Sequence, residues 1–135
     1  MKKLALILLI TASKIGYCQA IKDTIYGGLT PKDSLISEKN INVRFLEKVC
    51  IDEFNKYRYY VIYNRLKVKQ SLCDSAIKHS EWMYENNLFE HSSNCLAENI
   101  MGMGFSLNST YQQIAKEIIQ VWINSQPHRA HLLCK

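Results

Sequence analysis

Residues 109–133 read STYQQIAKEIIQVWINSQPHRAHLL, a pattern that predicts two helices joined at a proline. Apolar residues recur there at spacings of three and four and so share one helical face: Tyr111, Ile114, Ala115, Ile118 and Trp122. Ser109-Thr-Tyr-Gln112 is typical of a capping box at the start of the first helix. Ser125-Gln-Pro127 ends that helix and begins another helical turn, because proline fits the first turn of a helix.

Two further helices are predicted upstream. The first begins after Asn42, which suits an N-cap, and ends within residues 59–63, where aromatic and β-branched residues interrupt its stripe. That apolar stripe consists of Val43, Leu46, Val49, Cys50, Phe54 and Tyr57. The second helix starts at Ser71-Leu-Cys-Asp74, which resembles a capping box, and ends at Asn86-Asn87. Its apolar face predicts a packing role for His79 beside Leu72, Ala76 and Met83.

One short strand is predicted between the second and third helices, so the fold class is α+β. Residues 97–105 are apolar and punctuated by glycine, which is typical of a strand followed by a turn. A lone strand leaves its backbone N–H and C=O groups unpaired. We therefore expect low stability or self-association through the edge near Asn99–Met103.

Residues 1–20 have the layout of a secretory signal peptide. Lys2 and Lys3 form a basic start, residues 4–10 are an unbroken apolar run, and Ala20 is a small residue at a cleavage site. The apolar run is too short to cross a bilayer as an anchor. Tyr17 disfavours lipid modification of the cysteine that follows it, so we expect a free protein that begins after Ala20.

The segment after the predicted signal is polar and low in apolar residues. Residues 21–41 contain Gly27-Gly28 and Pro31 and are predicted to be a linker or a loose N-terminal arm. The whole chain has a formal net charge of +5, but residues 21–135 carry 14 basic and 12 acidic residues, a net charge of +2. The basic residues are dispersed along the sequence, so we do not expect nucleic acid as a partner.

Four cysteines remain after cleavage: Cys50, Cys73, Cys95 and Cys134. An even number in an exported chain favours disulfides, and we expect at least one. Three pairings are possible and the sequence does not choose among them. The four form no C-x-x-C pair, so a zinc finger or a thioredoxin-like site has little support.

An ordered series of polar residues runs through the second half of the chain. His91 follows the second helix, Glu98-Asn99 comes shortly after it, and Trp122-Ile-Asn-Ser125-Gln-Pro-His128 follows the third helix. Upstream stand Asn55-Lys-Tyr-Arg58 and Leu72-Cys-Asp-Ser-Ala76, then His79. In this order the residues resemble the bacterial SCP-like domain of the CAP superfamily, the cysteine-rich secretory, antigen 5 and pathogenesis-related proteins. The resemblance spans about residues 42–134.

The resemblance implies an α/β/α sandwich of the CAP type. It is mostly helical here because the last two strands of the family pattern are missing, so residues 42–135 would be a partial CAP/SCP-like domain. The family fold implies a cleft formed by His91, Glu98, Ser125 and His128. Ser125 stands where animal members carry a second glutamate. Asn99 would serve structure, and Trp122 would lie in the core.

Two kinds of chemistry remain open at these residues. His91 and His128 are suitable ligands for zinc, with Glu98 as a third ligand or as a base, and His131 as an extra ligand. Alternatively Ser125 would be a nucleophile, with His128 as its base and Glu98 orienting the histidine. A helix-capping role explains Ser125 equally well.

The resemblance favours a binding protein over an enzyme. It implies a secreted or periplasmic ligand-binding or effector module whose partner is a small molecule, a lipid or an extracellular protein. No stable membrane span is expected. A metal-assisted, peptidase-like hydrolase and an inactive truncated relic are the alternatives, and tight metal binding with measurable hydrolysis would support the enzyme.

Export with cleavage close to Ala20 is the first testable expectation. Protein recovered from outside the cytoplasm should begin near Ile21, and N-terminal sequencing checks this. Intact Met1 on that material, or a diacylglyceryl group on Cys18, would contradict a soluble exported form.

Overall fold

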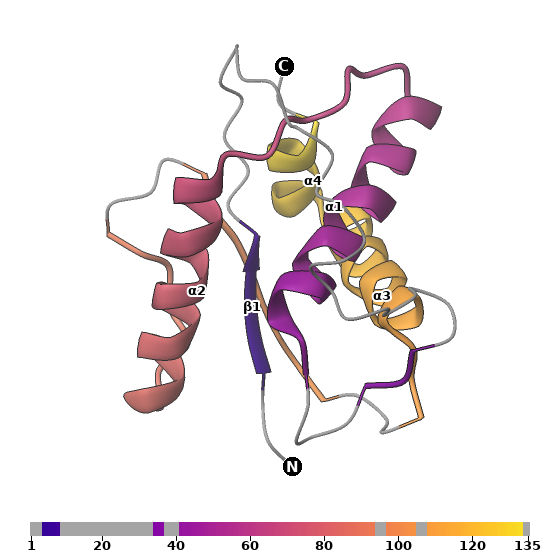
Figure 1. Cartoon of the computed structure of the whole chain (residues 1–135). Coiled ribbons are helices and arrows are strands. Elements are labelled where there is room, and N and C mark those ends of the chain that lie inside the picture. Colours follow the sequence, from indigo (N-terminus) through magenta and orange to yellow (C-terminus); the bar gives the residue numbers. More distant parts are fainter. Residues whose placement is uncertain (1–3, 9–33, 37–40, 94–96, 105–107, 134–135) are drawn as a thin grey trace.

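The computed structural model describes residues 4–8, 34–36, 41–93, 97–104 and 108–133. Its elements are β1 (Leu4–Leu8), α1 (Val43–Tyr60), α2 (Gln70–Glu85), β2 (Asn99–Met103), α3 (Tyr111–Asn124) and α4 (Gln126–Leu132). In Figure 1, α2 lies on one side of the strands, and α1, α3 and α4 lie on the other. The fold is α+β and mostly helical. No helix in the described ranges is long and apolar enough to cross a membrane.

The main core lies between α1 and α3. The predicted face of α3 is fully buried, and Ile119 joins it. From α1 come Phe45, Leu46, Val49, Cys50 and Phe54, and the cluster also includes Ile36 and Leu132. Burying a side chain of this size contributes about 1.5–3 kcal/mol, so this helix pair supplies most of the apolar stabilisation.

β2 separates two apolar clusters because successive side chains of a strand point to opposite faces. Ile100 packs with Ala76 and Met83 of α2. Met101 and Met103 pack against the cluster between α1 and α3. The strand therefore joins α2 to the rest of the core.

β2 is paired, which differs from the lone strand that the sequence suggests. β1 runs antiparallel to it, with Leu4 opposite Met103 and Leu8 opposite Asn99. β1 is the apolar run predicted to be the centre of a signal peptide. Residues 4–8 thus satisfy backbone groups on an edge that lacks a partner within residues 21–135 of the described chain.

Part of the predicted N-terminal arm is docked on the core. Leu35 forms an isolated bridge with Thr110, and the Ile36 N–H donates to the Ser109 carbonyl at 2.9 Å. The side chain of Ile36 is completely buried. Residues 21–33 and 37–40 lie outside the described residues, so the rest of the arm stays a prediction.

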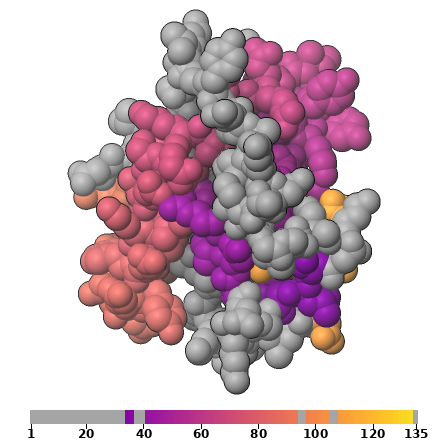
Figure 2. Space-filling model, in the orientation of Figure 1, coloured from indigo at the N-terminus to yellow at the C-terminus, as the bar shows by residue number. Residues whose placement is uncertain are grey.

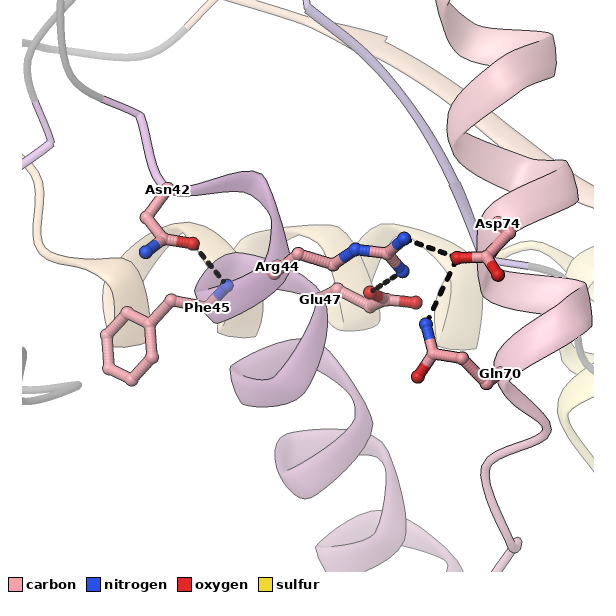
Figure 3. A network of polar contacts seen from close by, with 6 residues as sticks. All are labelled: Asn42, Arg44, Phe45, Glu47, Gln70 and Asp74. Atoms are coloured by element: carbon pink, nitrogen blue, oxygen red, sulfur yellow. Dashed lines mark hydrogen bonds and ion pairs between the residues drawn. The ribbon is translucent and has the colours of Figure 1, made fainter. Parts of the chain in front are cut away.

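α1 and α2 are tied together near their N-termini, as Figure 3 shows. Asn42 caps α1 as predicted, since its Oδ1 accepts from the Phe45 N–H at 2.9 Å. On α2, Asp74 accepts from Gln70 at 3.1 Å and forms an ion pair with Arg44 of α1. The Arg44 guanidinium lowers the pKa of the Asp74 carboxyl.

Two predicted capping boxes differ from the structure. α2 begins at Gln70 with Lys69 as its N-cap, so the box at Ser71 is wrong, because Asp74 binds Arg44 instead of a backbone N–H. α3 does begin with a capping box, but one residue later than predicted. Thr110 accepts from the Gln113 N–H at 3.2 Å, and Gln113 accepts from the Thr110 N–H at 2.8 Å.

α1 ends in a Schellman motif, a hydrogen-bonded stop that requires a left-handed residue. The Tyr63 N–H donates to the Arg58 carbonyl at 2.8 Å, and the Ile62 N–H donates to the Tyr59 carbonyl at 3.1 Å. Ile62 occupies the left-handed position with φ 64°. Glycine is usual there, and a β-branched residue in this region costs about 1–3 kcal/mol.

α2 ends in the same motif without that cost. The Leu88 N–H donates to the Met83 carbonyl at 2.9 Å, and Asn87 is left-handed with φ 53°. Asparagine tolerates this conformation well. The end of α2 at Asn86-Asn87 is therefore as the sequence predicts.

Cys50 and Cys73 are buried and free, so the described cysteines form no disulfide with each other. Burial raises the pKa of each thiol to about 12, and neighbouring Glu47 contributes to both shifts. Cys95 and Cys134 lie outside the described residues. A disulfide that involves them stays a prediction.

Removal of residues 1–20 should destabilise the fold, because β2 then loses its hydrogen-bonded partner. We expect residues 21–135 to melt about 5 °C or more below the full chain and to self-associate. Differential scanning calorimetry and sedimentation check this. Leu6→Pro, which removes one amide from β1, should shift the melt in the same direction. Equal melting temperatures and monomeric behaviour of both lengths would disprove the pairing.

Candidate functional site

His91 and Glu98 meet where β2 begins, on the side of α2. The His91 Nδ1 lies 2.9 Å from Glu98 Oε2, and the Ser92 N–H donates to the same oxygen at 2.8 Å. The His91 side chain is 59% exposed, whereas that of Glu98 is 2% exposed. A buried carboxylate therefore orients an accessible imidazole through Nδ1 and leaves Nε2 as the nitrogen for a ligand.

The segment that carries His91 is held by α2. His79 Nε2 lies 3.0 Å from the carbonyl oxygen of Glu90, and its ring stacks on Trp82 with centroids 5.5 Å apart. His79 is half-buried and lies outside the buried clusters, but the stacking on Trp82 fits the predicted packing role. It also holds the backbone next to His91, a role that its place on the apolar stripe did not reveal.

One oxygen of Glu98 has no hydrogen-bond partner in the part of the chain that the structure describes. Its Oε1 is buried and accepts no hydrogen bond from the described residues, while Oε2 accepts two. A buried polar atom without a partner costs about 1–3 kcal/mol. The atom is a natural acceptor for a donor or a cation that enters beside His91.

His128 and Ser125 form the other half of the site. Ser125 follows α3 and is the N-cap residue of α4, but its side chain makes no cap hydrogen bond. Its hydroxyl lies 2.8 Å from His128 Nδ1. The hydroxyl therefore orients the imidazole, again through Nδ1.

Asn99 connects the strand to α4. Its Nδ2 donates to the His128 carbonyl at 3.1 Å, and its Oδ1 accepts from His131 Nδ1 at 2.9 Å. Asn99 is buried, and the structural role predicted for it fits these bonds. Because neighbouring residues of an extended chain point to opposite sides, Glu98 reaches His91 while Asn99 reaches α4.

The histidines influence one another. The pKa of His128 is lowered by burial, and repulsion from His131 and His91 lowers it further. Charge repulsion of this kind acts over short distances in protein. The pKa of His128 is therefore affected by His91, a residue that is far from it in sequence.

The arrangement separates the two chemical alternatives. Ser125 and His128 are hydrogen bonded, as a nucleophile and base would be, but Glu98 orients His91 and not His128. Within the described ranges, no three histidine, cysteine or acidic side chains are grouped so that they could hold a metal ion. His131 donates to Asn99 through Nδ1. The four predicted residues therefore form two oriented histidine pairs, His91–Glu98 and His128–Ser125.

Comparison with protein families matches residues 51–135 to CAP, the cysteine-rich secretory protein family. The chain belongs to this family. The match covers most of α1 and all of α2, β2, α3 and α4, the elements that carry both histidine pairs. No curated protein and no solved structure matches the chain at a significant level.

The titration of His128 is a direct test of this geometry. Its pKa should lie below the ordinary 6.5, so the unfolded chain binds more protons there than the folded one. The free energy of unfolding is then highest, as far as His128 determines it, above pH 6.5. It falls as the pH drops from 6.5 toward the pKa of His128 in the folded chain. Histidine-detected NMR measures the midpoint.

Two variants separate the causes of the shift. His131→Gln keeps a donor for Asn99 and removes one neighbouring charge, so the His128 midpoint should rise toward 6.5. His79→Gln is the control and should leave it unchanged. A midpoint at or above 6.5 in the unaltered chain would refute the arrangement.

Proposed function

We propose that this CAP-family protein works outside the cytoplasm as a ligand-binding or effector module, and that its ligand is bound by His91, Glu98, Ser125 and His128. The observation that carries the proposal is the buried Oε1 of Glu98, which has no partner among the described residues. A buried carboxylate oxygen without a partner lowers the stability of the fold, and this one lies beside the exposed imidazole of His91. Its retention favours a site that binds a hydrogen-bond donor or a cation.

The ligand is a small molecule, a lipid headgroup or a group on an extracellular protein, and it presents a hydrogen-bond donor or a positive charge to Glu98. The four side chains offer imidazole Nε2 atoms, a hydroxyl and a carboxylate. A set of this kind recognises a polar group from several directions. The layers on either side of the strands support an α/β/α sandwich of the CAP type as the scaffold.

A divalent metal is compatible with the two histidines. Glu98 accepts from His91 Nδ1, the outer arrangement that raises imidazole basicity and fixes the ring in many zinc sites. His91 and His128 would be the protein ligands, and the ion would supply a Lewis acid that attracts an anionic ligand group. With two ligands from the chain, we expect weak and exchangeable binding.

Binding is favoured over hydrolysis by the position of the carboxylate. A serine nucleophile needs its histidine oriented by an acid, and here the acid orients the other histidine. A metal-assisted hydrolase would instead use Glu98 as the base through Oε1, since Oε2 already accepts two hydrogen bonds. An inactive relic would bind neither metal nor ligand.

Zinc titration tests the proposed site. Isothermal titration should detect one exchangeable zinc per chain, and His91→Ala or His128→Ala should abolish its uptake while far-ultraviolet circular dichroism stays unchanged. His79→Ala is the matched control and should still bind zinc, though more weakly, since it holds only the backbone beside His91. Equal zinc binding by all variants would contradict the assignment. Measurable peptide hydrolysis by the zinc-loaded chain would favour the enzyme.

A further inference from the structure

The corner where α1 ends carries large apolar side chains in an exposed position. Tyr59, Tyr60 and Ile62 are 77%, 81% and 95% exposed. The two tyrosine rings contact each other edge to face with centroids 6.3 Å apart. Figure 2 shows this part of the chain as the magenta corner at the upper right, which projects from the body. We call residues 59–69 the basic-aromatic corner.

The corner is held rigidly from below by two buried polar side chains of α1. The Arg58 Nε donates to the Asn64 carbonyl at 2.7 Å, and its Nη1 donates to the Leu132 carbonyl at 2.6 Å. Asn55 Oδ1 accepts from the Leu66 N–H at 2.8 Å. Asn55 and Arg58 are buried and hold the backbone of residues 64–66. The exposed Tyr59, Tyr60 and Ile62 therefore belong to a segment that is hydrogen bonded to the core.

Ile62 lies at the tip of the corner in a left-handed backbone conformation that disfavours β-branched residues. The left-handed position that ends α1 suits glycine or asparagine, and α2 has Asn87 at the equivalent place. At Ile62 the chain carries a strained β-branched side chain that is almost fully exposed. No packing within the described residues rewards that strain, so the side chain is suited to a contact outside the molecule.

Basic side chains lie along the same corner. Residues 63–69 form no helix or strand, and Arg65, Lys67 and Lys69 alternate along them, all exposed. Leu66 between them packs against the core cluster. The corner therefore presents its three cations to solvent on either side of a residue that is packed on the core.

The charge of the chain is concentrated in this region. Residues 54–73 contain five basic residues and no acidic residue. The rest of residues 21–135 carries nine basic and twelve acidic residues, a net charge of −3. Lys56 pairs with Glu53 and Arg58 is buried, so the corner itself presents three exposed cations, Arg65, Lys67 and Lys69, and no acidic residue.

We propose that the basic-aromatic corner docks the protein peripherally on an anionic lipid surface. An aliphatic side chain at a rigid tip enters the acyl boundary, tyrosines suit the headgroup region, and lysines and arginines attract acidic headgroups. The exposed isoleucine distinguishes this from binding to nucleic acid or to an acidic protein, which would use the charges and the tyrosines but leave Ile62 without a role. The corner lies apart from the four site residues in sequence and does not depend on their ligand.

Vesicle sedimentation with the full chain tests the docking. We expect binding to mixed phosphatidylcholine–phosphatidylglycerol vesicles that exceeds binding to phosphatidylcholine alone and falls with added salt. Lys67→Glu with Lys69→Glu should weaken partitioning to the anionic vesicles by about tenfold or more. The matched control is Lys78→Glu with Lys116→Glu, which changes the same charge at exposed sites on α2 and α3 and should have a much smaller effect.

A second pair of variants tests the tip. Ile62→Gly relieves the backbone strain, so it should raise the melting temperature while lowering vesicle binding. Val121→Asp removes an exposed apolar side chain from α3 and should leave vesicle binding unchanged. Because the full chain is used throughout, any contribution of residues 4–10 is common to all variants.

Three outcomes would overturn the proposal. One is equal binding to neutral and anionic vesicles. Another is equal loss of binding in the corner variants and in their controls. The third is binding to heparin or DNA, abolished by Lys67→Glu with Lys69→Glu, with no binding to anionic vesicles, which would assign the corner to an acidic polymer.

Discussion

The guanidinium of Arg58 joins the end of α1 to the corner that follows it and to the end of α4. Arg58 lies in α1 and is buried, and its guanidinium donates to the carbonyl oxygens of Asn64 and Leu132. A buried cation needs such partners, since an unpaired one is costly. Its aliphatic stem and planar head also lie near the rings of Phe54 and Tyr63, with the guanidinium carbon 5.9 and 5.3 Å from the two ring centres. Both the corner that follows α1 and the end of α4 are therefore positioned by one side chain.

α4 is in turn hydrogen bonded to Asn99 of β2, next to the histidines of the candidate site. Asn99 binds the His128 carbonyl and His131, and the residue before it binds His91 from the opposite side of the strand. Because neighbouring residues of an extended chain point to opposite sides, Glu98 and Asn99 at the start of β2 contact one histidine pair each. The imidazoles of His91 and His128 are thereby oriented by protein groups at Nδ1, and the buried Glu98 Oε1 has no partner among the described residues. β2 itself needs a neighbouring strand, which residues 4–8 provide.

Local periodicity made the helices predictable, and long-range pairing made the rest unpredictable. The buried face of α3 could be predicted because apolar residues spaced by three and four lie on one side of a helix. The capping box at Ser71 failed because Asp74 is taken by Arg44 from another helix, which no local pattern records. The order of the motifs indicated the family, which is confirmed, and four candidate site residues, but not that Glu98 would orient His91 instead of His128. Asn55 and Arg58 are part of the family motif in the sequence, but their hydrogen bonds to the corner and to α4 are visible only in the fold.

Amide hydrogen exchange in an Arg58→Met variant tests the central role of that guanidinium most directly. Methionine keeps the buried volume and removes the donors, so the Asn64 and Leu132 carbonyls lose their charged partner. The account predicts that the amides of Tyr63, Arg129 and Leu133 exchange about tenfold to a hundredfold faster, whereas those in the middle of α3 keep their protection. Unchanged exchange at these three amides would show that the corner and α4 hold their places without Arg58, which contradicts the account.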